Sequence, residues 1–168
     1  MRKLALFSLA AFSTSAFAQF SAPKELADLK WMLGTWESDF TMEMQGQKAP
    51  GKGVMEITDE GMFIKLKATF DFGVFTMKED MYLGWDAAKK RYFMHAFTNV
   101  GADPRIEYGT LKDGKLTMTT EPWGPAKDVA KSVLWAEGQE KVIFKLDMKS
   151  GDKWVPSMDS VWTPVKKG

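Results

Sequence analysis

Hydrophobic and polar residues alternate over most of the chain, and this period of two predicts β-strands. The clearest run is MFIKLKATFDF (62–72), where the even-numbered residues are apolar and, from Lys65 on, the odd-numbered ones are lysine, threonine or aspartate. Such alternation is typical of an antiparallel strand with one face in the core and one in water. It recurs in VFTMKEDMYLGW (74–85) and KVIFKLDMK (141–149).

One helix is predicted before the strands, since SAPKELADLKWML (21–33) places Leu26, Leu29 and Met32 on one face. Because no second helix interrupts the strands, the crossovers of a parallel sheet are not expected. The sequence therefore predicts an all-β fold, an up-and-down antiparallel barrel of about ten strands, with a two-sheet sandwich as the alternative. The predicted strands are 34–44, 53–59, 62–72, 74–85, 90–98, 105–111, 115–121, 128–136, 140–149 and 153–163.

The first 18 residues have the pattern of a signal peptide. Arg2 and Lys3 precede the apolar run LALFSLAAF (4–12), which is too short to span a bilayer, and AFA (16–18) supplies small residues for cleavage after Ala18. The alternative is an uncleaved N-terminal anchor. We expect a periplasmic or secreted protein without a stable membrane anchor, folded as a single barrel domain over residues 19–168.

Composition narrows the classes of function. The 23 basic and 22 acidic residues are evenly mixed, which argues against a nucleic-acid partner, because phosphate binding needs a concentrated basic face. The absence of cysteine excludes disulfides, thiol catalysis and zinc–thiolate sites. We expect a monomer or homodimer that needs no cofactor.

The segment GQKAPGKG (46–53) resembles a phosphate-binding P-loop. Gly53 stands where that motif has serine or threonine, and the segment joins two predicted strands instead of opening a helix. We therefore interpret it as a flexible hairpin loop.

His95 is the only histidine, so a site with two or three histidine ligands is impossible. In RYFMHAFTN (91–99), Phe93, His95 and Phe97 share one face of the predicted strand, but the other face is apolar too. The pattern alone therefore does not orient the strand. If this face points inward, the imidazole can ligate haem iron or hydrogen-bond a ligand; otherwise it is a structural histidine of the core or rim.

Glu79 interrupts the apolar face of the predicted strand 74–85. A carboxylate inside a barrel is costly unless paired, so an inward Glu79 marks a polar ligand contact or a buried pair, and a bulge that turns it outward is the alternative. Arg105 and Tyr108 are candidates for contact with a ligand carboxylate. Their spacing of three places them on opposite faces of a regular strand.

The 12 methionines, 7 tryptophans and 12 phenylalanines suit a cavity that holds an irregular apolar ligand, because methionine adapts its shape. An eight-stranded barrel is just wide enough to be filled by side chains or to hold one small ligand, so ten strands favour a cavity. The residues expected to line it are Phe70, Phe75, Met77, Phe93, His95, Phe97 and Tyr108.

A helical turn followed by Gly34-Thr35-Trp36 at the first strand resembles the lipocalin and calycin signature. That resemblance implies that Trp36 packs across a closed base, with Gly34 permitting the sharp entry into the strand. Together with YLGWDAAKKRYFMHAFTNVGADPRIEYGTLKDGKLTM (82–118) and SMDSVWTPVKK (157–167), LKWMLGTWESDF (29–40) resembles bacterial secreted lipocalin-like domains of unknown function. The resemblance implies a barrel with a ligand cavity and no established activity.

The chain is also similar to nitrobindin, a ten-stranded haem barrel that opens with Gly-x-Trp. Its proximal histidine lies near the C-terminus, whereas this sequence has no histidine after Glu140.

Taken together, these features of the sequence predict a carrier or sensor of a small hydrophobic or amphipathic molecule, not an enzyme. The alternatives are a haem or nitric-oxide barrel using His95, a barrel enzyme using Glu79 or His95 as acid–base, and a packed barrel acting through protein contacts.

Overall fold

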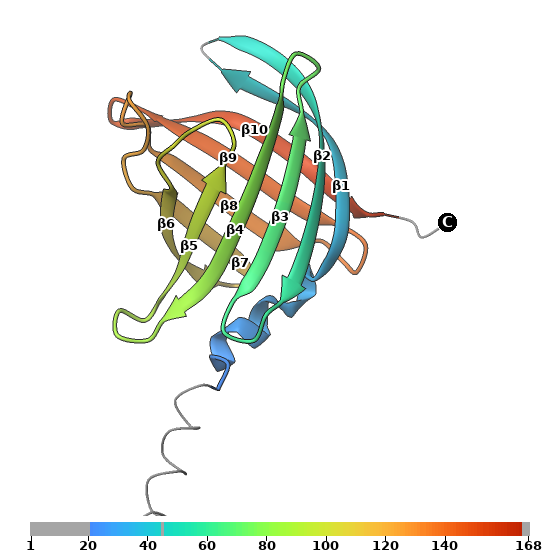
Figure 1. Ribbon diagram of the computed structural model, residues 1–168, viewed down its shortest axis with the longest axis vertical. Coiled ribbons are helices and arrows are strands. Elements are labelled where there is room, and N and C mark those ends of the chain that lie inside the picture. Colours follow the sequence, from blue (N-terminus) through green and yellow to red (C-terminus); the bar gives the residue numbers. More distant parts are fainter. Residues whose placement is uncertain (1–20, 45, 166–168) are drawn as a thin grey trace, which may run out of the picture.

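The computed structural model describes residues 21–44 and 46–165, so the predicted signal peptide (1–18) lies outside the described residues. Ten antiparallel strands form one closed barrel in which each strand pairs with its sequence neighbours (Figure 1). The strands are β1 (Gly34–Met44), β2 (Gln47–Asp59), β3 (Ile64–Asp71), β4 (Thr76–Asp86), β5 (Arg91–Thr98), β6 (Arg105–Lys112), β7 (Lys115–Thr120), β8 (Ala130–Ala136), β9 (Val142–Ser150) and β10 (Lys153–Pro164).

The first and last strands close the barrel by pairing with each other. Trp36 lies opposite Pro164, and Met42 lies opposite Met158. Closure gives each of the ten strands a neighbour on both sides. The predicted up-and-down barrel is therefore confirmed, and the two-sheet sandwich is wrong.

The predicted N-terminal helix is present as a 3₁₀ helix, η2 (Lys24–Met32). Its buried residues Leu26, Leu29 and Met32 are three apart, and a 3₁₀ helix has three residues per turn, so they form one apolar row. Figure 1 shows η2 at the end of the barrel opposite the β1–β2 and β3–β4 hairpins. We call the η2 end the base and the opposite end the mouth.

The prediction of a loop over residues 46–53 is wrong, because β2 begins at Gln47 and pairs with β1 along its length. Gly51 and Gly53 are needed for packing: an added Cβ would lie 2.6 Å from Phe40 Cζ or 2.5 Å from Trp162 Cη2. Pro50 is tolerated because β3 pairs with β2 only from Lys52 onward, so this part of β2 pairs on one side.

The core lies inside the barrel, where inward-facing residues of the strands meet those of η2. Ile64, Leu66, Ala68 and Phe70 of β3 are all buried, as the alternation of that run predicts. No helix in the described part of the chain is long and apolar enough to cross a membrane.

Candidate ligand-binding cavity

The barrel interior holds a cavity of about 430 Å³ that reaches from the base to the mouth. Its lining is mainly apolar and aromatic. Every strand except β5 and β6 contributes at least two apolar or aromatic residues to it. Nine of the lining residues are methionines: Met32, Met42, Met55, Met77, Met81, Met94, Met118, Met148 and Met158. Since methionine side chains are flexible and polarisable, this lining can adjust to ligands of irregular shape.

The base of the cavity is closed by η2 and the start of β1. The indole Nε1 of Trp36 donates a hydrogen bond to the carbonyl oxygen of Met32 over 2.8 Å, and the Tyr92 hydroxyl donates to that of Glu25 over 2.9 Å. Gly34 has a φ of +129°, a conformation that favours glycine and that sets the turn from helix to strand. Trp36 therefore packs across the closed base, as the lipocalin resemblance implies.

A polar cluster, made of Glu79 on β4 and Arg105 and Glu107 on β6, lies towards the mouth. Arg105 Nη1 donates to Glu79 Oε1 over 2.7 Å, and Arg105 Nε donates to Glu107 Oε1 over 2.9 Å. Both glutamates are 4% exposed and line the cavity. The open question about Glu79 is thus resolved: it points inward and forms a buried ion pair.

Burial changes the proton affinities of this cluster. Burial raises the pKa of Glu107, an effect that the charge of Arg105 opposes and that of Glu79 reinforces. Burial alone would lower the pKa of Arg105, but the two neighbouring carboxylates outweigh it and raise the pKa above its usual value. Arg105 therefore remains a cation throughout the physiological range.

Aromatic residues surround the mouth. Phe72 and Phe75 stack with their ring centroids 4.8 Å apart, and Phe40 packs edge-on against Phe72 at 5.7 Å. Across the mouth, Trp123 Nε1 donates to the Asp103 carbonyl over 2.9 Å, and its ring centroid lies 6.0 Å from Arg105 Cζ. The entrance thus has an apolar side and a polar side.

Of the seven residues predicted to line the cavity, the structure places three there: Phe70, Phe75 and Met77. Phe70 is buried, whereas Phe75 is 43% exposed because it lies at the mouth. Their position in the lining agrees with the prediction, and whether they bind a ligand stays a prediction.

The prediction that Phe93, His95 and Phe97 point inward is wrong. In the antiparallel pair of β4 and β5, His95 lies opposite Tyr82, on the outer face, while Ala96 lies opposite the inward-facing Met81. His95 is exposed and does not line the cavity. It therefore cannot serve as the axial ligand of a haem inside the barrel, nor act beside Glu79, which lies on the other side of the wall.

Tyr108 also lies on the outer face, so its predicted place in the cavity is wrong. It pairs with Phe93, and its ring carries the guanidinium carbon of Arg91 3.4 Å from the centroid. Arg105 is three residues from Tyr108 and therefore lies on the opposite face of β6, pointing into the cavity. The partner that sequence reasoning missed is Glu107: it is two residues from Arg105, and this spacing puts both on one face of a strand.

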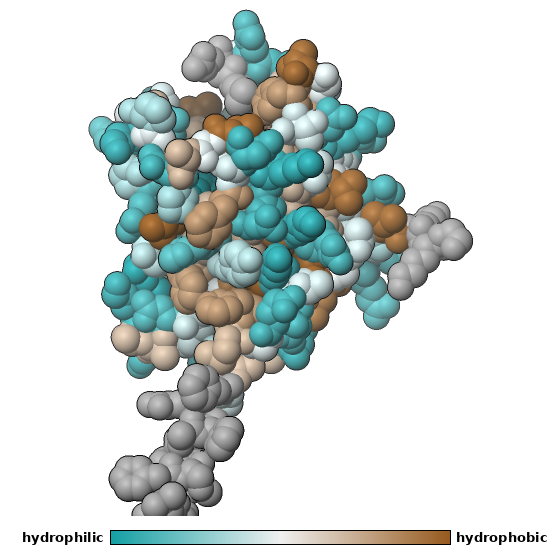
Figure 2. Space-filling model, viewed as in Figure 1, coloured by the Kyte–Doolittle hydropathy of each residue, from teal (hydrophilic) through white to brown (hydrophobic). Residues whose placement is uncertain are grey.

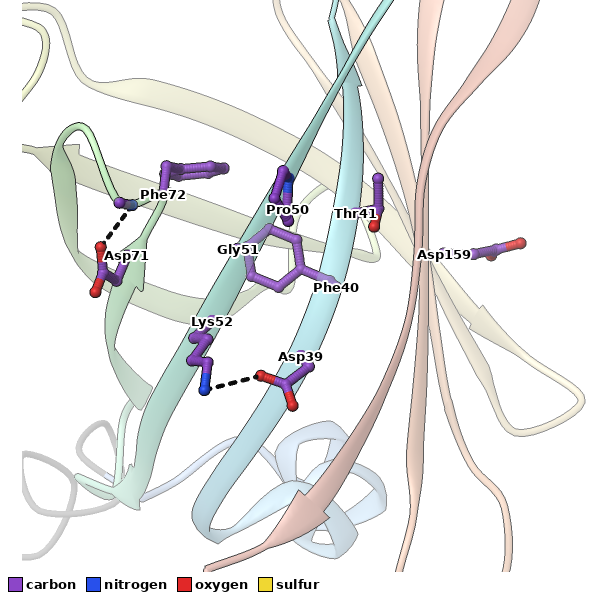
Figure 3. Close-up of a pocket in the computed structure, with 10 residues that line it drawn as sticks. Asp39, Phe40, Thr41, Pro50, Gly51, Lys52, Asp71, Phe72 and Asp159 are labelled. Atoms are coloured by element: carbon purple, nitrogen blue, oxygen red, sulfur yellow. Dashed lines mark hydrogen bonds and ion pairs between the residues drawn. The ribbon is translucent and has the colours of Figure 1, made fainter.

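A second hollow of about 720 Å³ lies on the outside of the wall, where β1 and β2 extend beyond β3 (Figure 3). Lys52 Nζ and Asp39 Oδ1 lie 3.8 Å apart in it, and both side chains are more than 80% exposed. Phe40 and Phe72 line this hollow and the cavity alike. We regard it as a surface depression, because its ion pair is open to water and holds no fixed geometry.

Comparison with known proteins gives a family and a fold. The sequence profile of a family described as "Protein of unknown function (DUF1579)" matches residues 22–163. No curated protein matches the sequence. The crystal structure of Rv2717c from M. tuberculosis is similar at a TM-score of 0.66 and 12% identity, covering 87% of this chain and 100% of that one.

The structure of the S-type phycobiliprotein lyase CPES from Guillardia theta is also similar. Its TM-score is 0.59 at 12% identity, and the match covers 93% of this chain and 99% of that one. At this identity both neighbours show a shared barrel fold and nothing about the ligand.

Proposed function

Since the chain belongs to DUF1579, a family of proteins of unknown function, its role must be argued from its own interior, and we propose that it binds a small hydrophobic or amphipathic molecule inside the barrel. The observation that carries this proposal is the cavity of about 430 Å³. Its volume lies within the range of about 300–1,000 Å³ typical of small-molecule sites. Such sites combine an apolar lining with a few polar groups, and this cavity has that composition.

The arrangement favours binding over chemistry. The charges of the polar cluster pair with one another: Arg105 bridges Glu79 and Glu107. His95, the other acid–base candidate, lies outside the barrel. A carrier or sensor needs only an apolar lining and an entrance. The apolar lining runs along the interior of the barrel, and the entrance lies at the mouth.

The test uses N-phenyl-1-naphthylamine, a neutral apolar dye whose fluorescence rises in an apolar site. We expect saturable binding of about one dye per chain to the purified protein. Met77→Trp should weaken it at least about tenfold, because the indole fills space at the mouth where Met77 lines the cavity. Lys78→Trp, on the exposed face of the same strand, should bind like the wild type.

The outer wall offers a competing place for the dye. Figure 2 looks onto the outer face of β3, β4 and β5, where hydrophobic side chains lie among hydrophilic ones, and Phe97 is 52% exposed on β5. Binding that is lost in Phe97→Ser and kept in Met77→Trp would place the dye on this face and overturn the proposal.

A native ligand is sought by native mass spectrometry of protein purified gently from its own cell compartment. A stoichiometric added mass, released on unfolding, would identify the ligand class directly.

We further infer, from the pattern of residues 1–18 alone, that this compartment is the periplasm or the exterior. N-terminal sequencing of the protein from that fraction should begin at Gln19; an intact Met1 in the cytoplasm would contradict this.

A further inference from the structure

The charges that line the cavity are unbalanced. The charged lining residues are Arg105 and three acidic residues, Glu79, Glu107 and Asp128. Glu79 and Glu107 are almost fully buried, whereas Asp128 is exposed at the mouth. Within the described residues that line the cavity there is no lysine or histidine, so Arg105 is their single cation.

Arg105 is already committed to its two glutamates. Its Nη1 and Nη2 lie 2.7 and 3.5 Å from the oxygens of Glu79, and its Nε lies 2.9 Å from Glu107. These bonds use three of the five N–H donors of Arg105, so an anionic ligand head would either add a third negative charge beside the guanidinium or displace one of the glutamates. Displacement would leave a buried carboxylate without its counter-charge, which is strongly unfavourable.

Glu107, by contrast, has unused acceptor capacity. Within residues 21–44 and 46–165, the Arg105 Nε–H bond to Oε1 is the hydrogen bond that the structure gives its carboxyl group. In this part of the chain, Arg91 Nε is the one fully buried side-chain nitrogen or oxygen that lacks a hydrogen bond. Glu107 Oε2, which also receives none, is therefore not fully buried. Since Glu107 lines the cavity, this oxygen can accept from a ligand.

We propose that the cavity selects amphipathic molecules with a cationic amine head over those with a carboxylate head. This inference rests on the proposed function and names the ligand class of the same site. An ammonium carries three N–H donors and no acceptor, so it complements Glu107 Oε2 and the excess of carboxylates. A carboxylate head meets like charge there, while an alkyl chain of either kind fits the apolar lining.

The test compares three ligands with one alkyl chain and different heads: decylamine, 1-decanol and decanoic acid. Each displaces N-phenyl-1-naphthylamine from the wild-type protein at pH 7.5. We expect decylamine to bind at least about tenfold more tightly than decanoate, with decanol between them, because like charges in an interface are costly. Equal affinities, or tighter binding of decanoate, would overturn the inference.

Changing the cluster should change the order. In the double variant Glu79→Gln and Glu107→Gln, Arg105 is the one remaining charge of the polar cluster, so decanoate should bind more tightly than decylamine. The single variant Glu107→Gln keeps the Glu79–Arg105 pair and should narrow the ratio without reversing it. The matched control is Glu56→Gln on the exposed face of β2, which should leave the wild-type order unchanged.

The two proposals fail in different ways. If the dye does not bind, or binds equally to the wild type and Met77→Trp, the cavity is not a binding site and both proposals fall. If the dye binds in the cavity but the order of heads is wrong, or the double variant keeps the wild-type order, the amine selectivity alone is overturned.

Discussion

At the scale of the single residue, Arg105 holds the polar cluster together, because it neutralises two carboxyl groups that are almost out of reach of water. Arg105→Met should therefore lower the free energy of unfolding at pH 7 by about 3–5 kcal/mol, the cost of leaving buried charges unpaired. Urea unfolding measures this. The control is Lys145→Met, which breaks an ion pair with Asp159 that is at least half exposed and should cost only about 0–1 kcal/mol.

A loss as small as that of the control would mean that Glu79 and Glu107 do not depend on Arg105. The same experiment at pH 4 adds a second criterion. Burial favours the protonated form of Glu107, so the cost of Arg105→Met should shrink as the pH falls.

The second prediction at this scale concerns pH. Burial raises the pKa of Glu107 from its ordinary value of 4.5; the charge of Arg105 opposes this rise and that of Glu79 reinforces it. Between 4.5 and the raised value, the folded protein holds a proton that the unfolded chain has lost, so rising pH destabilises the fold. Glu107→Gln removes this effect and can still accept the Arg105 Nε–H bond.

We therefore expect the stability of Glu107→Gln relative to the wild type to increase as the pH rises from 4.5, and to level off above the folded-state pKa. Urea unfolding at intervals between pH 4 and 8 gives this difference. Glu56→Gln, on the exposed outer face, should show no comparable trend. A difference that is flat across the range would contradict the raised pKa.

Residue orientation could be predicted only in part from the sequence. Glu79 stood out because a charge interrupts an apolar face, and Arg105 because a guanidinium can bind a ligand carboxylate. Glu107 could have been found from its spacing of two from Arg105, which puts both on one face of a strand. The orientation of His95 was not predictable, because both faces of β5 are apolar. It is set by the register across the β4–β5 turn, where Trp85 lies opposite Tyr92 and both point inward.

At the scale of the element, η2 closes the base by burying one row of side chains. Leu29 is fully buried, so Leu29→Ala should lower the free energy of unfolding by about 2–5 kcal/mol, through lost apolar contacts and the cavity left behind. Lys24→Ala, an exposed position of the same helix, separates this effect from helix propensity and should be nearly neutral. A small effect of Leu29→Ala would mean that the base stays closed without the η2 row.

The two elements that sequence reasoning described least well are η2 and the start of β2. Leu26, Leu29 and Met32 fit one face of an α-helix or a 3₁₀ helix, so a helix was predictable and its type was not. The glycines of 46–53 suggested a loop because glycine weakens an isolated strand. In the fold Gly51 lies against Phe40 and Gly53 against Trp162, and such long-range packing is invisible to a local pattern.

At the scale of the whole molecule, ten alternating runs joined by short turns determine a closed barrel, and the sequence predicted that architecture and nearly every strand. The pattern of alternation does not predict whether side chains fill the interior of the barrel. The volume depends on how the methionines and aromatic residues pack across the barrel, and a few rotamers decide between a filled core and a cavity.

A ligand that binds in the cavity must also stabilise the fold, because the unfolded chain has no cavity to bind it. With free N-phenyl-1-naphthylamine at about 100 times its dissociation constant, the free energy of unfolding of the wild type should rise by about 2.7 kcal/mol. Lys78→Trp should gain the same amount, since its change lies outside the barrel. At that dye concentration Met77→Trp should gain at least about 1.3 kcal/mol less, the consequence of a tenfold weaker affinity. An equal gain in all three proteins would show that the dye stabilises the fold from somewhere other than the mouth of the cavity.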